Sequence, residues 1–322
     1  MSRSRVLDSL KKSLKLNARR LTAELAAWAS TKSHDQIKLK NFLIENQIEI
    51  EDIYSGNHSW VEFKRRIGLP TPPPGINENV LSKRLGSLLY VDDRELLKAW
   101  KYAIQNEKID ATRIQMLAYQ MITSGTVSPS QFLDDLSAHP AVKEELIELI
   151  EWQINQSGKA YAQFQDAPAY WPISLHNRYT RSDILTAVGY RNAKIRPDFR
   201  EGCLLLENIK TEMMFVTLDK SKGFHESVQY HDYAISPNLF HWQTQNRASP
   251  SNKTGQRYIE SINGNGWRFF LFVRENSDCA FVALGEVVLN EFNGERPIEV
   301  TWLLKQSMTA ELFRRLSIIR ST

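Results

Sequence analysis

The sequence is poor in cysteine: Cys203 and Cys279 are the only two among 322 residues, and both lie in apolar surroundings. It contains no Cys-x-x-Cys pair, and the common zinc sites need more ligands at closer spacing. We therefore expect two free, buried thiols in a reducing compartment. We also expect no metal ion and no other cofactor.

Long apolar runs are absent as well. No segment approaches the roughly 20 continuous apolar residues that a membrane helix needs. The first twenty residues, MSRSRVLDSLKKSLKLNARR, are basic but lack the apolar core and the small-residue cleavage site of a secretory signal. These absences predict a cytoplasmic protein that does not interact with a membrane.

The sequence also lacks a strong charge excess and the motifs of several enzyme classes. The 41 lysines and arginines against 37 acidic residues give a formal net charge of +4, which permits nucleic-acid binding but does not require it. There is no phosphate loop of the form Gly-x-x-x-x-Gly-Lys-Ser/Thr, no Gly-x-Ser-x-Gly elbow and no recognisable Ser-His-Asp triad. A non-enzymatic role is therefore favoured.

Helical periodicity dominates the first half of the chain. Up to about residue 165 the apolar residues recur at spacings of three and four, which is typical of amphipathic helices. The proline-rich segment 70–74 interrupts the pattern, because proline does not fit inside a helix. We expect an all-helical region over residues 1–167 that docks a partner. Four tryptophans occur in these helical patterns, and we expect them in the core of this region: Trp28, Trp60, Trp100 and Trp152.

The pattern changes near residue 168. Short runs rich in β-branched and aromatic residues alternate with turn signals, and they predict the strands CLLLE, EMMFVTLD, RYIESI, WRFFLFVRE, CAFVALGEVVL and IEVTWLLK. One helix is predicted here. Thr180 is its N-cap, Asp183 completes a shortened capping box, and Gly189 ends it. NGNG at 263–266 predicts a hairpin.

The sequence thus predicts an α+β protein. The all-helical N-terminal region precedes a mainly antiparallel β domain over residues 168–322, in the form of a barrel or half-barrel.

Aromatic rings and amides are concentrated in YHDYAISPNLFHWQTQ, residues 230–245. Rings can stack on a base, with about 1–3 kcal/mol per base in single-strand binders, and glutamine can read an adenine edge. If a base is flipped out of a duplex, Trp242 or Tyr233 would stack on it. The proposed pocket consists of Tyr230, Asp232, Tyr233, His241, Trp242, Gln243 and Gln245.

Basic and hydroxyl side chains flank this stretch on expected loops, where phosphate contacts are commonly made. Together with the rings they are typical of a nucleic-acid interface, which predicts DNA as the partner. The expected contacts to the DNA backbone are His176, Arg178, Lys220, Arg247, Lys253 and Arg257.

Structural roles remain open for several of these residues. Phe240 and Trp242 alternate with polar positions, so one face of their strand can belong to a core. Tyr230 and Tyr233 are equally compatible with hydrogen-bonded structural tyrosines. Asp232 can cap a turn, and Arg257 can belong to a turn before a strand.

One catalytic alternative is a magnesium-dependent nuclease, which needs carboxylates to hold the metal and a lysine beside the phosphate. Asp198, Glu207 and Lys210 form a loose version of such a set. Glu207 and Lys210 are three residues apart, whereas the usual spacing is two.

Several long segments resemble the DUF3427 family, a domain of formally unknown function. They are LHNRYTRSDILTAVGY, REGCLLLENIKTEMMFVTLDKS, YHDYAISPNLFHWQTQNRASPSNKTGQRYI, FFLFVRE and GERPIEVTWLLK. Upstream, IYSGNHSWVEFKRRIGL and RLGSLLYVDDRELL resemble the helical segment that precedes this domain. The family is usually found at the C-terminus of bacterial DEAD/DEAH-type superfamily 2 helicases, often with a phospholipase-D-like nuclease module. Thr244 stands where the family usually shows serine.

The resemblance implies a role beside helicases in restriction or phage defence, where accessory domains commonly recognise DNA or its modifications. By analogy it also suggests a PUA-like or SRA-like barrel, although a fold does not establish a function. We therefore predict a non-catalytic DNA-binding protein, with modified DNA as one class of target, that acts with a helicase or nuclease supplied in trans. The alternatives are a metal-dependent nuclease and a scaffold or regulator of a helicase without DNA affinity of its own.

Overall fold

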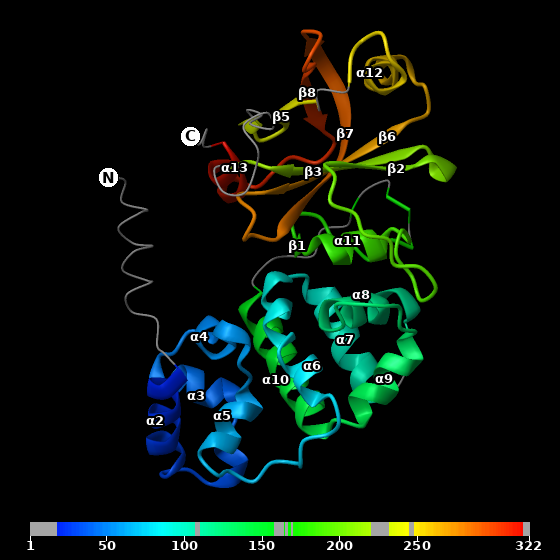
Figure 1. Ribbon diagram of the computed structural model, residues 1–322. Helices are drawn as coiled ribbons and strands as arrows, with labels where there is room; N and C mark the ends of the chain where they lie inside the picture. Colours follow the sequence, from blue (N-terminus) through cyan, green and yellow to red (C-terminus); the bar gives the residue numbers. More distant parts are fainter. Residues whose placement is uncertain are drawn as a thin grey trace. The chain divides into compact units, whose positions relative to one another are not determined.

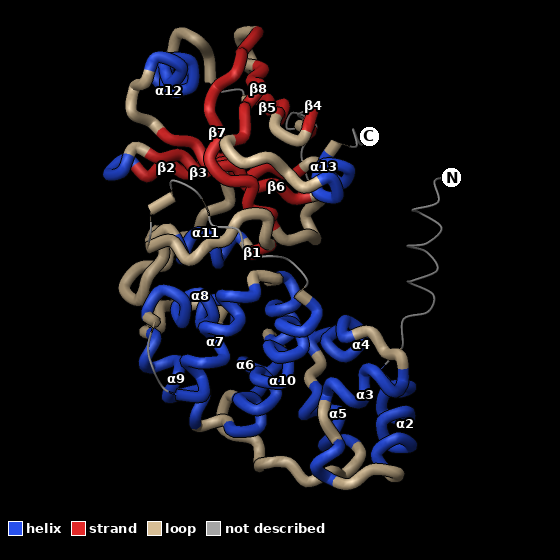
Figure 2. Tube along the Cα trace, turned by 180° about the vertical axis from the view of Figure 1, so that it is seen from behind, coloured by secondary structure: helices blue, strands red, loops and turns tan. Residues whose placement is uncertain are grey.

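The computed structural model describes residues 18–106, 110–157, 164, 167–168, 170–219, 232–244 and 248–317. The chain divides into two compact units. Unit 1 comprises Met1–Leu89, Arg94–Gly158 and Arg191–Arg196, and unit 2 comprises Tyr90–Asp93, Lys159–Tyr190 and Pro197–Thr322. A helical region followed by a sheet is the α+β class that the sequence predicted, so that prediction is confirmed (Figures 1 and 2).

Unit 1 is helical. Its α-helices are α2 (Ala18–Ala29), α3 (Leu39–Asn46), α4 (Ile50–Tyr54), α5 (Trp60–Arg66), α6 (Glu78–Ser82), α7 (Arg94–Asn106), α8 (Ala111–Met121), α9 (Pro129–Ser137) and α10 (Pro140–Gln156). The 3-10 helices η1 (His34–Gln36), η2 (Ser55–Asn57) and η3 (Leu85–Tyr90) complete this half of the chain. None of the helices among the described residues is long and apolar enough to cross a membrane.

Local signals fix where several helices begin. Ser59, Asp110 and Ser128 cap α5, α8 and α9, because each side chain accepts a hydrogen bond from a backbone N–H three residues later. The long helix α10 contacts α3, α5, α7 and α9, and so lies at the centre of the unit. Trp60 and Trp100 are fully buried around it, as the sequence predicted.

A buried carboxylate on α10 also holds the first turn of α5. The Trp60 N–H donates to Glu145 Oε1 at 2.6 Å, and the Val61 N–H donates to Oε2 at 2.9 Å. Burial raises the pKa of Glu145 to about 7, although both N–H groups act in the opposite direction. The folded protein therefore holds a proton at Glu145 over a pH range in which an unfolded glutamate has lost it.

This carboxylate predicts a pH dependence of stability. Between pH values near 4.5 and 7 the folded state binds more protons than the unfolded state, so the free energy of unfolding falls as the pH rises. A pKa difference of this size corresponds to about 3 kcal/mol. Urea unfolding at pH 5 and pH 7.5 should show the decrease in the wild type and a much smaller one in Glu145→Gln. The exposed Glu95→Gln variant on α7 should keep the wild-type slope, and an unchanged slope in Glu145→Gln would refute the assignment.

Unit 2 is built on a sheet. Its strands are β1 (Arg178–Tyr179), β2 (Cys203–Leu206), β3 (Thr211–Thr217), β4 (Tyr233–Ser236), β5 (Leu239–Gln243), β6 (Arg268–Arg274), β7 (Phe281–Asn293) and β8 (Glu299–Leu304). Its helices are α11 (Arg181–Ala187), η4 (Glu207–Ile209), α12 (Lys253–Ile259), η6 (Glu260–Asn263) and α13 (Ala310–Leu316).

The eight described strands follow the order β2-β3-β6-β7-β8-β5-β4, and β1 pairs with β7. The pairs are antiparallel except β3 with β6, which is parallel. Among the described strands β2 and β4 are the two edges, and the sheet does not close into a barrel. Of the two forms that the sequence predicted, a barrel or a half-barrel, the closed barrel is therefore wrong, because a pattern of short strands does not determine whether edge strands pair.

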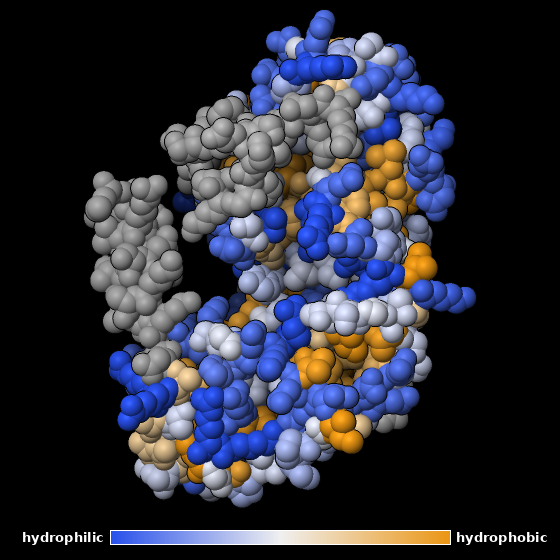
Figure 3. All heavy atoms as spheres, in the orientation of Figure 1, coloured by the Kyte–Doolittle hydropathy of each residue, from blue (hydrophilic) through white to orange (hydrophobic). Residues whose placement is uncertain are grey.

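The two faces of the sheet are covered differently. On one face Phe240, Trp242 and Trp302 pack with residues of α12 and α13. The other face carries a series of stacked rings, in which Phe215 and Phe272 have centroids 5.7 Å apart. On the face of the molecule shown in Figure 3, hydrophilic residues predominate between small hydrophobic patches.

The local predictions in unit 2 had mixed outcomes. Helix α11 is confirmed: Thr180 caps it in a capping box with Asp183, and Gly189 follows with a φ of +81°. The predicted strand RYIESI is wrong, because these residues form the end of α12 and part of η6. Asn252 caps α12 by accepting from the N–H groups of Thr254 and Gly255.

Two further predictions need correction. The NGNG segment 263–266 connects η6 to β6 and does not join two strands, so the predicted hairpin is wrong. Its glycines do adopt the expected positive φ, +76° at Gly264 and +80° at Gly266. Cys203 and Cys279 are free thiols, but each is only partly buried.

Candidate nucleic-acid interface

The alternation of β5 decides which of the predicted pocket residues can meet a ligand. Phe240 and Trp242 point into the core, with exposed fractions of 0% and 5%. Leu239, His241 and Gln243 lie on the opposite face of the strand and are partly exposed. We call the side of β4, β5, β8 and β7 that carries His241 the outer face.

A row of polar side chains crosses the outer face. Tyr233 on β4 pairs with His241 on β5, His241 with Thr301 on β8, and Thr301 with Glu291 on β7. The rings of Tyr233 and His241 are stacked, with centroids 5.0 Å apart and an interplanar angle of 19°. At the other end the Thr301 hydroxyl donates to Glu291 Oε1 at 3.2 Å. These four residues are the outer-face row.

On the outer face, apolar residues lie on one side of the outer-face row and polar residues on the other. Leu239, Leu303 and Val288 pair across β5, β8 and β7 on one side. Gln243 pairs with Glu299 on the other side, and its Nε2 donates to Glu299 Oε1 at 3.4 Å. The face therefore offers two stacked rings between apolar contacts and hydrogen-bonding groups.

Asp232 has a structural role beside this face. Its side chain is 7% exposed, and Oδ1 accepts a hydrogen bond from the Gln243 backbone N–H at 2.9 Å. This bond fixes the start of β4 against the end of β5. Asp232 therefore has a structural role, but as a link between two strands and not as the cap or turn residue that the sequence left open.

Trp242 does not belong to a binding surface. Its ring lies 5.4 Å from that of Tyr258 and 6.1 Å from that of Trp302, and all three are in the core. A ring so enclosed cannot stack on a base. The assignment of Trp242 to the pocket is therefore corrected, because it falls on the inward positions of an alternating strand.

The predicted contacts to the DNA backbone are also dispersed. Arg257 Nε donates to Glu212 Oε2 at 2.7 Å, and the two side chains are 11% and 0% exposed, so Arg257 belongs to the interior. Arg178 is paired with Asp92 through its backbone N–H and Nε. His176 adopts a φ of +61°, and its N–H donates to the Ala283 carbonyl. Lys253 is exposed at the first position of α12.

Part of the predicted site lies outside the described residues: Tyr230, Gln245, Lys220 and Arg247. Of the remaining pocket residues, Tyr233, His241 and Gln243 come together on the outer face.

The nuclease alternative gains no support from the described part of the chain. Asp198 is exposed and paired with Arg200 at 3.0 Å. Glu207 and Lys210 are exposed at the two ends of η4. Within the described ranges, no group of three histidine, cysteine, aspartate or glutamate side chains could hold a metal ion.

Two buried polar clusters escaped the sequence analysis. Glu212 accepts from the hydroxyl of Tyr258 at 2.5 Å as well as from Arg257. Burial and then the nearby Glu212 carboxylate raise the pKa of the Cys203 thiol, so it is not an activated nucleophile. The signal for this cluster was an acidic residue inside the otherwise apolar run TEMMFVT.

The second cluster joins residues distant in the sequence within unit 2. The buried Asp93 carboxylate accepts from the hydroxyls of Ser174 and Tyr179. Nothing in the local sequence shows that residue 93 and residues 174–179 meet, because the contact spans about eighty positions.

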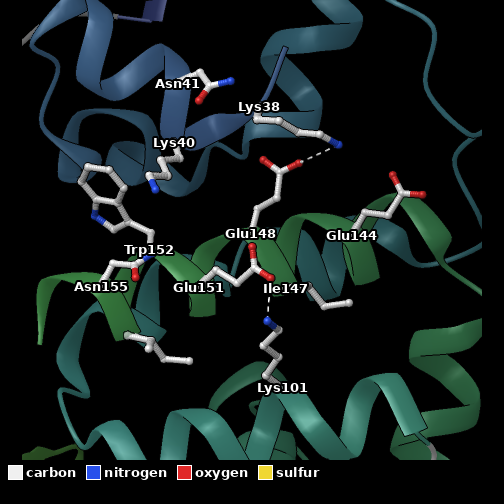
Figure 4. Close-up of a pocket in the computed structure, with 11 residues that line it drawn as sticks. Lys38, Lys40, Asn41, Lys101, Glu144, Ile147, Glu148, Glu151, Trp152 and Asn155 are labelled. Atoms are coloured by element: carbon white, nitrogen blue, oxygen red, sulfur yellow. Dashed lines mark ion pairs between the residues drawn. The ribbon is translucent and has the colours of Figure 1, made fainter. Parts of the chain in front are cut away.

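Unit 1 contains a cavity of about 560 Å³ beside α10 (Figure 4). Its lysines and glutamates largely neutralise one another: Lys38 lies 3.9 Å from Glu148, and Lys101 lies 2.8 Å from Glu151. The Leu39 N–H also donates to Glu148 at 2.7 Å. Trp152, expected in the core, instead lines this cavity and is partly exposed.

Comparison with known proteins identifies one domain. Residues 173–316 match the model of the family described as a domain of unknown function, DUF3427. This match confirms the resemblance of residues 173–316 to that family. It begins just before β1 and ends at the last residue of α13, so it contains the whole described sheet. No curated protein matches the chain.

Proposed function

We propose that this chain is a non-catalytic DNA-binding protein in which the outer face of unit 2 receives a base. The observation that carries the proposal is the stacked pair of Tyr233 and His241, which is partly exposed at the β4 edge of that face. An unpaired base would continue this stack by placing its own face against the ring of Tyr233.

The surroundings of the pair favour a base over a phosphate. Glu291 and Glu299 lie on the same face and would repel a phosphodiester group. Carboxylate oxygens accept hydrogen bonds from the exocyclic amino group of cytosine, and glutamine can pair with adenine. The apolar residues Leu239, Leu303 and Val288 lie beside the outer-face row and would accommodate a methyl group on a base. Methylated or otherwise modified DNA is therefore included in the proposal.

The stacking contact can be tested by removing one ring. Tyr233→Ala should weaken binding of a fluorescently labelled oligonucleotide by about 5- to 150-fold, which corresponds to the loss of about 1–3 kcal/mol of stacking. Tyr233→Phe keeps the ring and should bind nearly as well as the wild type. Fluorescence anisotropy at a fixed salt concentration measures all three proteins.

A matched control is Tyr102→Ala, which removes a tyrosine that is 54% exposed on α7 of unit 1. It should leave the affinity unchanged. Equal affinities for Tyr233→Ala and the wild type would contradict the proposed site. Comparison of methylated and unmethylated oligonucleotides in the same assay tests the preference for modified DNA.

From the helicase context that the resemblance implies, we propose that the protein acts with a helicase or nuclease supplied in trans, in restriction or phage defence. Co-purification of such an enzyme with a tagged chain tests the partnership. Absence of any DNA affinity together with such a partner would favour the scaffold or regulator alternative. Magnesium-dependent cleavage that disappears in Glu207→Ala would instead establish the nuclease alternative.

A further inference from the structure

A proline-rich segment of unit 1 connects α5 to α6. Residues 70–74 read PTPPP, and we call residues 70–77 the strap. Each proline fixes its own φ, and it also keeps the residue before it out of the helical region. The strap is therefore extended and stiff up to Pro74. It exposes Pro73, Pro74 and Ile76, and Ile76 is 88% exposed.

Arg65 on α5 anchors the first half of the strap. Its Nε donates to the Thr71 hydroxyl at 3.1 Å, and a terminal N–H group donates to the Pro72 carbonyl at 2.8 Å. The same guanidinium pairs with the buried carboxylate of Glu78 at the start of α6. This anchor does not depend on pH near neutrality, because arginine keeps its proton.

His139, directly before α10, anchors the second half of the strap. Its Nε2 lies 2.7 Å from the Ile76 carbonyl oxygen, and its Nδ1 lies 2.6 Å from the Asp135 carbonyl oxygen. Carbonyl oxygens only accept hydrogen bonds, so both bonds form together only when both ring nitrogens carry a proton. The observed geometry is therefore that of the imidazolium, the charged form of histidine.

The strap also packs directly against the imidazole ring. A Cβ added at Gly75 would lie 2.5 Å from His139 Cδ2, so a larger residue does not fit at this position without a shift. His139 is itself only 8% exposed. The position of the ring therefore determines where this part of the strap can lie.

Loss of the proton is incompatible with this arrangement. A neutral imidazole has one N–H group for two carbonyl oxygens, so at one of the two contacts a nitrogen lone pair would face an oxygen lone pair. The bond to the Asp135 carbonyl raises the pKa of His139 from 6.5, burial opposes this change, and the bond to the Ile76 carbonyl raises the pKa further. The bonds thus stabilise the charged ring, and the charged ring closes the strap.

The charged groups around His139 also favour its protonated form. The carboxylates of Glu78 on α6 and Asp135 on α9 raise the pKa of the ring. The cations of the neighbouring helices have partners of their own. Arg65 pairs with Glu78, and Lys143 on α10 donates to the Ser137 hydroxyl at 3.4 Å.

We propose that His139 is a pH-sensitive clamp, which holds the strap closed while its ring is protonated and releases it when the proton is lost. The closed strap binds the proton more tightly than the released strap does. The clamp is therefore closed below pH 6.5 and opens as the pH rises through the raised pKa of His139. Arg65 holds Thr71 and Pro72 in both states, so the released part is residues 75–77.

Release of the strap changes how an apolar surface is presented. Ile76 on the strap is 88% exposed, and Val80 on α6 is 54% exposed. The clamp lies within unit 1 and is independent of the proposed DNA-binding face of unit 2.

Hydrogen exchange of the full chain tests the clamp at the turn that follows it. The Glu78 N–H donates to the Gly75 carbonyl at 3.2 Å, and the Val80 N–H donates to the Asn77 carbonyl at 2.9 Å. From pH 6 to pH 9 the protection factors of these two N–H groups should fall by about 10- to 100-fold, the effect of losing one hydrogen bond to a charged group. Protection factors already correct for the intrinsic pH dependence of exchange.

Two variants show whether His139 causes the change. His139→Gln cannot carry the charge, so its protection factors should be low at both pH values. His34→Gln replaces an exposed histidine of η1 and should keep the wild-type fall. Equal protection of the wild type at pH 6 and pH 9 would overturn the proposal, and so would an unchanged fall in His139→Gln.

NMR of the wild type labelled with ¹⁵N-histidine gives a test that needs no variant. Among the seven histidines, His139 is the one whose ring proton shows a nuclear Overhauser effect to Gly75. At pH 6 both of its ring nitrogens should be protonated, and its pKa should exceed 6.5. A neutral His139 ring at pH 6 would overturn the clamp.

Discussion

Replacing Trp242 with alanine is expected to destabilise unit 2 by about 3–5 kcal/mol, the usual cost of removing a large buried ring. Trp242 is 5% exposed and packs between Tyr258 and Trp302 in the core of the sheet. The alanine would leave a cavity that the rings of Tyr258 and Trp302 cannot close. Urea unfolding followed by circular dichroism measures the loss.

The Trp242→Phe variant separates packing from binding. It keeps an aromatic ring in the core, so it should lose less stability than Trp242→Ala and should bind DNA with wild-type affinity. A stable, folded Trp242→Ala protein that had lost only its DNA affinity would show that the indole belongs to a binding pocket after all.

Replacing Glu212 with alanine should have a similarly large effect, about 3–5 kcal/mol, because it leaves a buried positive charge without its partner. Glu212 is fully buried, and it accepts hydrogen bonds from Arg257 at 2.7 Å and Tyr258 at 2.5 Å. The same unfolding experiment measures the change.

Removing both charges at once is the informative comparison. The double variant Glu212→Leu/Arg257→Met should be more stable than Glu212→Ala, because no charge is then left unpaired in the interior. A loss of less than about 0.5 kcal/mol in Glu212→Ala, as for a surface substitution, would contradict the burial of the pair.

The sequence predicted those features that depend on neighbouring residues. Thr180, Asp183 and Gly189 specify the start and end of α11 within ten positions, and the structure places each in its expected role. The segment RYIESI failed because Asn252, just upstream, caps a helix that overrides its strand propensity. The strand propensity of a residue reflects how well it fits the half-buried surface of a sheet. These residues pack as a helix instead.

The candidate site depended on information that the sequence does not contain. The alternation in FHWQ shows that Phe240 and Trp242 share a face opposite His241 and Gln243, but not which face meets the core. Packing decides this: Trp242 contacts Tyr258 of α12 in the core, whereas His241 stacks on Tyr233 on the opposite face. Likewise, the burial of Arg257 follows from Glu212, which is 45 positions away in the sequence.

The most direct test of the central claim is photocrosslinking of the full chain to an oligonucleotide that contains 5-iodouracil, followed by mass spectrometry of the crosslinked peptide. If the outer face receives a base, crosslinks form to Tyr233 or His241 and disappear when both residues are replaced by alanine. Crosslinks confined to other peptides, unchanged in that double variant, would contradict it.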